Sequence, residues 1–375
     1  MATENNNKTL NVPNLRFPEF SGEWEKFRND SLFNVVSEKN KGKQITSVLS
    51  ASQTDGMVSR DSLGIDIKFE EDSIKNYKIV REGDYVIHLR SFQGGFAFSD
   101  RVGVCSPAYT ILRPTQQISY GFLKPFFMSN KFIDSLRLVT YGIRDGKSIS
   151  VEEWLKLSTS LPSVEEQKKI SAFLSLLAER IATQIKIIED LKKLKSAISK
   201  ILFDHCERAS NIRLLGDICK ITTGKLDANA MTDDGKYPFF TCAREDYKTD
   251  TFAFEGDSLL ISGNGEIGIV KRYNGKFNAY QRTYVLQNFS ENIEYLMYYI
   301  EYHLPRRVLK EKNVGAMPYI VLSTLSNMPI KIPDIKEQCS VCRTLTCLSE
   351  LIELNSKLRT SYISQKSYLL AQMFI

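Results

Sequence analysis

LPSVEEQKKISAFLSLLAERIA at residues 161–182 and IPDIKEQCSVCRTLTCLSELIE at residues 332–353 are two versions of one segment. When Pro162 is placed on Pro333, the Glu-Gln pair that follows each proline also coincides. The matches then continue without a gap as far as Phe203 and Phe374. Self-similarity at a constant distance along a chain indicates an internal duplication, which therefore organises the whole sequence.

The residues before each segment are related in the same way. Gly83-Asp84 pairs with Gly256-Asp257, at an offset slightly different from that of the segments above. The chain is thus one unit written twice, a divergent block followed by a similar helix. This interpretation divides it into a disordered lead-in at 1–14, a first block at 15–160, a helix at 161–207, a second block at 208–331 and a second helix at 332–375.

Both repeated segments are expected to form long helices. A proline near the start suits a first helical turn, and nearby acidic residues complement the positive end of the helix dipole. Mostly apolar residues recur at alternating steps of three and four, from Ile170 to Leu202 and from Val341 to Met373, which is the coiled-coil period. The polar exceptions in these two series are Gln184, Lys195, Asn355, Arg359 and Lys366. An ordinary bundle helix is the alternative, although each segment is longer than a globular domain needs. If the first helix connects the blocks, the second can return antiparallel to it.

The blocks before the helices mix strands and helices. Short strands are expected after the Gly-Asp pairs, at 85–89 and 258–261, and Asn274-Gly275 is a typical hairpin signal. Helical stretches are expected at 120–136 and 292–304. The predicted fold class is α+β: two similar mixed blocks separated by two long antiparallel coiled-coil helices, with a pseudo-two-fold internal repeat.

Composition narrows the functional classes. A hydrophobic content of 42% and a charged content of 25% are typical of globular proteins and exclude wholesale disorder. The net charge of +6 slightly favours a polyanionic partner. No apolar run is long enough for a membrane span, and the first residues lack a secretory signal. The seven cysteines are irregularly spaced, so we expect a reducing, cytoplasmic location.

One glycine-rich motif suggests nucleotide binding. GNGEIG at 263–268 has the spacing of a dinucleotide-binding loop. Such a loop must be followed by a helix whose N-terminus binds the pyrophosphate, whereas a hairpin signal follows here. We therefore expect a loop between two strands. His88, His205 and His303 are isolated in sequence, and none belongs to a recognisable catalytic motif.

A pair of cysteines suggests zinc. Cys339 and Cys342 have the right spacing, but the sequence has no second pair of ligands to complete a four-coordinate site. The first repeat has Lys168 and Ser171 at the corresponding positions, so the shared fold does not need a metal. We expect buried or half-buried thiols, and no catalytic residue, metal or cofactor in this chain.

Basic and amide side chains recur in corresponding loops of both blocks. Arginine, glutamine and asparagine can bond base edges, whereas lysine chiefly neutralises phosphate. Any one of these residues is more often an ordinary surface group, and only their recurrence in both copies favours DNA. The expected DNA-binding residues are Arg90, Gln93, Arg144, Lys147, Asn264, Lys271, Arg272, Arg282, Arg306, Arg307, Lys310 and Lys312.

Over essentially its full length the sequence resembles the specificity subunits of type I restriction–modification enzymes. The resemblance is carried by LRFPEFSGEWE at 15–25, by Gly142 and Gly315 and, most specifically, by the Pro-x-x-x-Glu-Gln openings of the two helices. It implies that the blocks are target-recognition domains, each reading one half of a bipartite, asymmetric DNA site. It also implies that the helices set the distance between the half-sites.

The resemblance further implies partners. Two methyltransferase subunits are expected to dock on the helices, with Glu166, Gln167, Glu337 and Gln338 as partner-binding residues. These subunits bring S-adenosylmethionine, and restriction subunits bring ATP and Mg²⁺, in the cytoplasm of a bacterium or archaeon. The chain itself is then not an enzyme. The alternatives are a coiled-coil adaptor without DNA readout and a fused methyltransferase–nuclease, whose catalytic motifs the sequence lacks.

Overall fold

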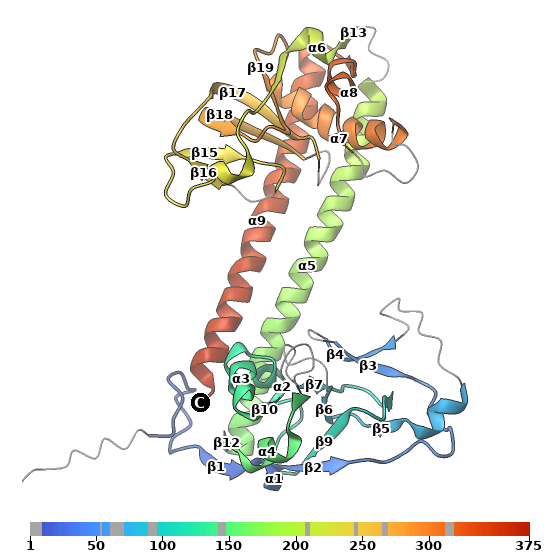
Figure 1. Ribbon diagram of the computed structural model, residues 1–375, viewed down its shortest axis with the longest axis vertical. Coiled ribbons are helices and arrows are strands. Elements are labelled where there is room, and N and C mark those ends of the chain that lie inside the picture. Colours follow the sequence, from blue (N-terminus) through green and yellow to red (C-terminus); the bar gives the residue numbers. More distant parts are fainter. Residues whose placement is uncertain are drawn as a thin grey trace, which may run out of the picture. The chain divides into compact units, whose positions relative to one another are not determined.

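The chain forms two compact units, residues 1–185 with 358–375 and residues 186–357, in the computed structural model of Figure 1. Two long helices, α5 (Val164–Cys206) and α9 (Ile335–Met373), contribute to both units. Each unit therefore combines one mixed block with the start of one long helix and the end of the other. The structure describes residues 10–52, 55–60, 71–88, 96–141, 148–206, 211–243, 247–264, 269–311 and 319–375.

The first unit contains a four-stranded antiparallel sheet of order β2-β9-β6-β7, with the strand pairs β1-β12, β3-β4, β5-β8 and β10-β11. Its strands are β1 (Glu25–Arg28), β2 (Phe33–Val36), β3 (Leu49–Ser52), β4 (Gly56–Ser59), β5 (Lys78–Val80), β6 (Tyr85–Ile87), β7 (Ala97–Phe98), β8 (Gly103–Cys105), β9 (Thr110–Pro114), β10 (Thr140–Tyr141), β11 (Ser148–Ile149) and β12 (Ser158–Leu161). Its shorter helices are α1 (Asn29–Leu32), η2 (Glu71–Asn76), α2 (Lys124–Phe127), α3 (Asn130–Ser135), η3 (Leu136–Val139) and α4 (Val151–Lys156).

The second unit contains a six-stranded sheet of order β14-β19-β17-β18-β15-β16 and the pair β13-β20. Its strands are β13 (Ile212–Leu214), β14 (Lys220–Thr223), β15 (Tyr237–Phe240), β16 (Tyr247–Thr249), β17 (Phe254–Ser262), β18 (Val270–Ala279), β19 (Thr283–Gln287) and β20 (Pro329–Lys331). Its shorter helices are α6 (Leu215–Ile218), η4 (Ala228–Ala230), α7 (Ile293–Glu311) and α8 (Leu322–Ser326). Only β15 and β18 pair in parallel among these strands.

The two units share one framework, which confirms the duplication. The order β2-β9-β6-β7 of the first sheet is repeated as β14-β19-β17-β18 in the second. In the pairing of β2 with β9 the first residue of β2, Phe33, lies opposite Pro114. In the pairing of β14 with β19 the first residue of β14, Lys220, lies opposite Gln287. In each unit a further strand pair, β1-β12 or β13-β20, joins the first strand of the block to the strand before a long helix.

The Asn-Gly hairpin prediction was wrong. Asn274 and Gly275 lie inside the continuous strand β18, where Gly275 faces Gly256 of β17. Both glycines have positive φ, 146° and 104°, so they let the long strand pair deform rather than turn back. The antiparallel strands β17 and β18 are instead joined by the segment 263–269. The expectation that GNGEIG connects two strands is therefore confirmed.

Each long helix ends in an aromatic cluster. In the first unit Phe374, just after α9, stacks on Phe126 with ring centroids 5.3 Å apart. In the second unit Phe203, in the last turn of α5, packs edge-on against Tyr299 at 5.5 Å. Phe203 and Phe374 are the corresponding residues of the repeat, and both are buried. The duplicated sequence therefore anchors both helix ends by the same contact.

The helices run antiparallel within each unit, as predicted. In the first unit Ile170 of early α5 shares a core with Met373 of late α9. In the second unit His205 of late α5 lies 3.5 Å from Glu337 of early α9. The predicted coiled-coil seam is the buried side of both helices. Its fully buried apolar members are Ile170, Leu174, Leu177, Ile188, Val341, Leu345, Leu348, Leu369 and Met373.

Part of the expected disordered lead-in belongs to the fold. Asn11 donates from its amide to the Trp24 carbonyl, and Asn14 donates to the side chain of Gln372 at 3.1 Å. Residues 1–9 lie outside the described residues. Among the helices of the described residues, none combines the length and apolar character needed to cross a membrane.

Candidate nucleic-acid interface

The Pro-x-x-x-Glu-Gln motif forms the same helix start in both units. The amide of Gln167 donates to the Pro162 carbonyl at 3.0 Å, and the amide of Gln338 donates to the Pro333 carbonyl at 3.0 Å. Gln167 also bonds the backbone at residues 117 and 119. Both glutamines are buried, so each ties the first turn of a long helix to its own unit. Their side chains face the interior rather than a partner.

The glutamates of the motif differ. Glu166 is buried and accepts two hydrogen bonds from Arg16, at 2.8 and 2.7 Å. Glu337 is half-buried, and its side chain is 43% exposed with His205 beside it. The structure thus argues against a partner contact for Glu166, Gln167 and Gln338, because these side chains are enclosed by their own unit. A partner contact stays a prediction for Glu337.

The Gly-Asp pairs of the repeat have a structural role. Asp84 accepts two hydrogen bonds from Arg113, both 2.9 Å, and Asp257 accepts two from Arg272, at 3.0 and 2.6 Å. The Arg272 guanidinium holds the pKa of the Asp257 carboxyl below its usual range. Because two donors of the Arg272 guanidinium are already bonded to Asp257, the structure argues against Arg272 as a base-reading residue.

Five segments of the second unit converge at one end of strands β17 and β19, and we call them the loop cluster: 224–226, 241–243, 262–264, 280–283 and 319–321. The carbonyl of Arg282 accepts from the Gly263 amide at 2.9 Å and from the Cys242 thiol at 3.4 Å. The Ile320 amide donates to the Gly263 carbonyl at 2.8 Å. A Cβ on Gly263 would lie 2.5 Å from the Arg282 carbonyl, so glycine is required for this approach.

The loop cluster brings three predicted DNA-binding residues together. Arg282 is exposed, and Asn264, which follows Gly263, is half-buried. Lys271 is half-buried beside the cluster, with its ammonium 6.0 Å from the Phe240 ring centroid. Sequence reasoning missed Lys225, which the Gln281–Leu226 and Gly224–Thr283 backbone bonds bring to the same cluster. Its only local signal was a glycine directly after a strand.

The predicted basic run lies at the end of α7. Arg306 packs its guanidinium over the Tyr302 ring, 4.2 Å from the centroid, and Arg307 pairs with Glu311 at 3.0 Å. Lys310 is exposed. Arg306 and Lys310 are therefore available for phosphate, whereas part of the charge of Arg307 is already balanced.

The remaining predicted DNA-binding residues, Arg90, Gln93, Arg144, Lys147 and Lys312, lie outside the described residues. Arg90 and Gln93 fall between β6 and β7, the counterparts of β17 and β18. Arg144 and Lys147 fall between β10 and β11, which pair with each other. Their contact with DNA stays a prediction.

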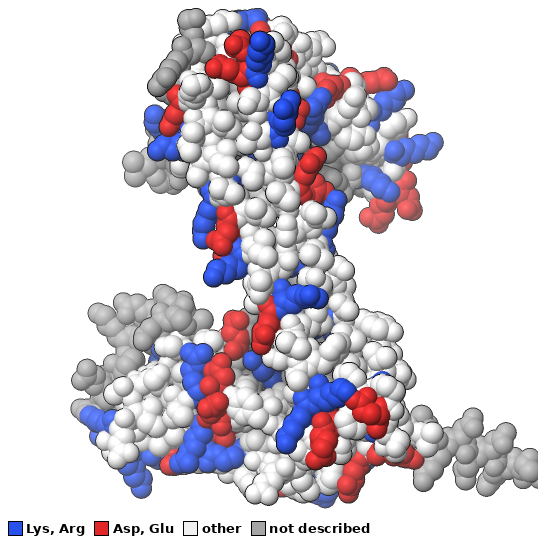
Figure 2. All heavy atoms as spheres, turned by 180° about the vertical axis from the view of Figure 1, so that it is seen from behind, with Lys and Arg blue, Asp and Glu red and all other residues white. Residues whose placement is uncertain are grey.

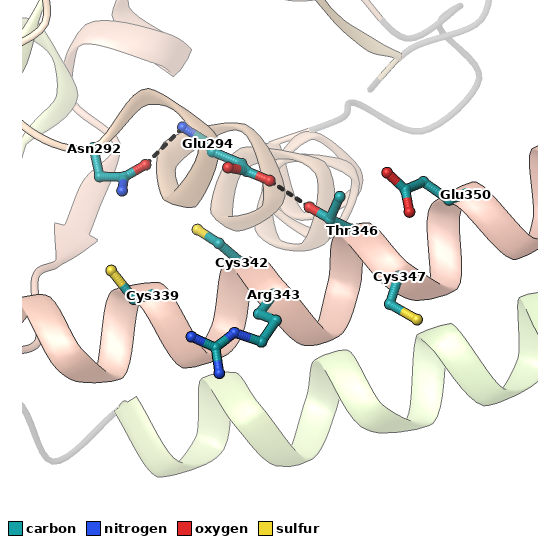
Figure 3. Close-up of a pocket in the computed structure, with 8 residues that line it drawn as sticks. All are labelled: Asn292, Glu294, Cys339, Cys342, Arg343, Thr346, Cys347 and Glu350. Carbon is teal, nitrogen blue, oxygen red and sulfur yellow. Dashed lines mark hydrogen bonds between the residues drawn. The ribbon is translucent and has the colours of Figure 1, made fainter.

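Three cysteines line a hollow between α7 and α9 in the second unit (Figure 3). Cys342 is buried, whereas Cys339 and Cys347 are exposed, so the expectation of buried or half-buried thiols holds for Cys342 alone. Glu294 accepts a short hydrogen bond from the Thr346 hydroxyl across the hollow. Among the described residues no group of histidine, cysteine and carboxylate side chains is arranged to hold a metal.

An exposed apolar stripe follows α5 in the second unit. Ile187, Leu194 and Ile201 recur every seven residues and are 40%, 47% and 68% exposed. Leu351 and Leu354 of α9 are also exposed in this unit. In the space-filling view much of the visible surface over the two helices is uncharged, whereas acidic and basic side chains alternate elsewhere on that face (Figure 2). A heptad stripe is the surface that another amphipathic helix would cover.

The framework, its duplication and the helix openings agree with a known family. Two copies of the type I restriction modification DNA specificity domain match this sequence, at residues 21–193 and 209–361. The chain belongs to this family. Each match extends into a long helix, so the specificity domain of the family includes the first part of α5 or α9 as well as a mixed block.

Curated relatives within the family are similar over different lengths. The specificity subunit of the type I restriction enzyme EcoDI from Escherichia coli is 36% identical over 151 residues, which are 40% of this chain and 33% of that protein. A putative type I specificity subunit of Mycoplasma pneumoniae is 27% identical over 161 residues, 40% of this chain and 43% of that protein. The MjaVIII specificity subunit of Methanocaldococcus jannaschii is 25% identical over 390 residues, 92% of this chain and 89% of that protein. The chain therefore matches less than half of the first two relatives.

Solved structures show the same fold. The S subunit of a type I restriction–modification system from M. genitalium has a TM-score of 0.65 at 17% identity, over 97% of this chain and 99% of that one. A chain from a structural study of complex assembly and conformational transition in the type I system has a TM-score of 0.56, also at 17% identity, over 95% and 98%. The predicted fold class of this family member is therefore confirmed.

Proposed function

We propose that this chain is the DNA-recognition subunit of a type I restriction–modification complex, in which each unit reads one half of a bipartite, asymmetric site. The observation that carries the proposal is the duplicated specificity domain, with one strand framework and different loops in the two copies. Two different readers in one chain imply two different half-sites. The chain performs no chemistry of its own and works in the cytoplasm, where its DNA lies.

Selection from a pool of random DNA duplexes tests this proposal. The full chain is used alone and together with its methyltransferase partner, and bound duplexes are sequenced. We expect two short specific parts, unrelated by symmetry and separated by a non-specific spacer. A coiled-coil adaptor would enrich no sequence. A continuous or palindromic site would contradict the assignment of one half-site to each unit.

We also propose that two methyltransferase subunits dock on the long helices and that restriction subunits join them. The methyltransferases would bring S-adenosylmethionine, and the restriction subunits ATP and Mg²⁺. Support comes from the exposed stripe of Ile187, Leu194 and Ile201, because a partner helix would bury these side chains. A duplicated scaffold also supports two copies of one partner.

Adjacent residues of α5 provide a matched test of docking. Ile201→Glu places a charge on the stripe, whereas Lys200→Glu changes an exposed neighbour that points around the helix by about 100°. We expect Ile201→Glu to abolish co-elution with the methyltransferase in size-exclusion chromatography and Lys200→Glu to retain it. Co-elution of both variants with the methyltransferase would show that the stripe is not part of the interface.

A further inference from the structure

We propose that Tyr319 is a base-contacting residue that determines the half-site read by the second unit, an inference that rests on the proposed DNA recognition. Tyr319 opens the last segment of the loop cluster, and its side chain is 65% exposed. Neither a motif nor a charge singles it out in the sequence. Only the fold brings it beside Arg282 and Asn264.

The backbone beneath Tyr319 is fixed. The next residue, Ile320, is 5% exposed, and its amide donates to the Gly263 carbonyl at 2.8 Å. The hydroxyl of Tyr284 donates to the Ile320 carbonyl at 3.0 Å. Because both polar groups of Ile320 are bonded to the framework, Tyr319 is an exposed ring on a preorganised support. Such a ring loses little conformational freedom when it binds.

The surroundings of Tyr319 favour DNA as its partner. The five segments of the loop cluster contain two basic residues, Lys225 and Arg282. Val321 and Leu322 beside Tyr319 are 42% and 52% exposed. Cations that approach phosphate, together with an exposed aromatic and apolar surface, match the requirements of a DNA groove. There an apolar side chain can contact the thymine methyl group or the face of an opened base step.

The first unit has a corresponding buried isoleucine and a different residue directly before it. Ile149 and Ile320 each lie two residues before a short helix, α4 or α8, and both are 5% exposed. The residue before the isoleucine is Ser148 in one copy and Tyr319 in the other. A constant framework with a variable residue is the arrangement that lets two copies of one domain read different bases.

The experiment measures binding of the full chain to the bipartite duplex that selection yields for the unaltered protein, and to every single-base change of that duplex. Tyr319→Ala is expected to lower discrimination at one or two positions of one half-site by about tenfold or more, and to leave the other half-site unchanged. Tyr319→Phe is expected to retain the preference, because the ring rather than the hydroxyl makes the contact. Urea unfolding confirms that both variants are folded.

The control is Phe252→Ala. Phe252 is a 42% exposed aromatic residue just before β17, and the nine residues of β17 carry the chain from there to the loop cluster. It therefore lies at the opposite end of β17 from the loop cluster, and its variant should keep the original preference at every position. The assignment of Tyr319 would be overturned if Tyr319→Ala left base discrimination unchanged. It would also be overturned if Tyr319→Phe lost as much discrimination as Tyr319→Ala. Neither result would contradict the proposed DNA recognition. Selection of no sequence by the unaltered chain would overturn both.

Discussion

At the scale of single residues, the two motif glutamines carry different numbers of hydrogen bonds. Gln167 accepts from the Ser119 amide at 2.8 Å and donates to the Gln117 carbonyl at 2.8 Å, besides its bond to the helix start. Among the side-chain bonds of the described residues, the Gln338 amide donates only to the Pro333 carbonyl. The first helix is therefore tied more firmly to its block than the second.

This difference predicts unequal losses of stability. Gln167→Ala leaves buried backbone groups unpaired and should lower the free energy of unfolding by about 1–3 kcal/mol, and by more than Gln338→Ala does. Gln365→Ala, an exposed glutamine of α9, serves as the control. Urea unfolding followed by circular dichroism measures all three. An equal loss in the two buried variants would show that the extra bonds of Gln167 contribute nothing net.

Arg282 and Arg272 should respond differently to removal. Arg282→Ala should reduce binding to particular bases of one half-site by about 1–3 kcal/mol, because an exposed arginine can bond a guanine bidentately. Arg272→Ala instead removes the partner of Asp257 and should mainly lower stability. Binding to single-base variants, together with urea unfolding, separates the two effects. A change of base preference in Arg272→Ala with unchanged stability would reverse the assignment.

The basic run of α7 should contribute affinity without specificity. The double variant Arg306→Ala/Lys310→Ala should weaken binding to all sequences alike, because these side chains are expected to neutralise phosphates. For each phosphate that the variant no longer neutralises, the slope of log affinity against log salt should become shallower by about 0.9. Titrations at several salt concentrations measure this slope. Altered base preference at an unchanged slope would contradict the division of roles.

The cysteines should differ in their reactivity toward alkylating reagents, according to the burial and the pKa of each thiol. Burial raises the pKa of the Cys105, Cys219 and Cys342 thiols to about 12, and it raises that of Cys206 as well. Thiolate is the reactive form, so a raised pKa leaves little of it at pH 8.

Brief alkylation of the folded chain at pH 8, followed by peptide mass spectrometry, should therefore modify Cys339 and Cys347 first, because both thiols are exposed. The half-buried Cys242 should follow. While the chain stays folded, raising the pH toward the elevated pKa values should increase labelling of the buried thiols, because more of each thiol is then thiolate. Rapid labelling of Cys342 at pH 8 would mean that α7 does not cover this side of α9.

At the scale of elements, the loop cluster depends on one close backbone approach. Gly263→Ala places a methyl group 2.5 Å from the Arg282 carbonyl and 3.2 Å from the Tyr284 ring, so the segments must separate. We expect loss of discrimination in the half-site of the second unit only. Gly42→Ala is the control, because the nearest atom to its added Cβ is a flexible side-chain carbon of Gln44 at 3.4 Å. Duplex-variant binding provides the measurement, and preserved discrimination in Gly263→Ala would show that the cluster tolerates separation.

The elements themselves followed largely from periodicity in the sequence. The seam from Ile170 to Leu202 predicts α5 because helix burial repeats with a local period that sequence displays directly. The Asn274-Gly275 prediction failed because a glycine that permits positive φ serves a turn and a deformed strand pair equally well. The pairing with β17 decides between a turn and a deformed strand, and the local sequence around Gly275 does not show that Gly256 lies opposite it.

The site was less predictable than the fold, for the same reason. The sequence drew attention to Arg282 and Asn264, whose segments the fold brings together, yet it could not show that Asp257 already binds Arg272. It likewise could not show that Glu166 is enclosed with Arg16. Partners that are distant in sequence decide whether a charge is free, and only the folded backbone brings them together.

At the scale of the whole molecule, each long helix is fixed at both of its ends. The motif glutamines bond the helix starts, and Phe203 and Phe374 bury the helix ends. Since α5 starts in the first unit and ends in the second, and α9 does the reverse, each helix is anchored in both units. A change of helix length should therefore be transmitted to the DNA readers rather than absorbed in a loop.

The last prediction lengthens both helices at the boundary of the units, between Ile185 and Lys186 in α5 and between Lys357 and Leu358 in α9. Four added residues extend each helix by about 6 Å and turn it by little more than one full turn, so the apolar seam nearly keeps its face. The selected site should keep both half-sites, with a spacer longer by about one or two base pairs. Two added residues rotate the seam by about 200° and should reduce stability instead. If the four-residue variant folds, binds DNA and still selects the original spacer, the helices do not set the distance between the half-sites.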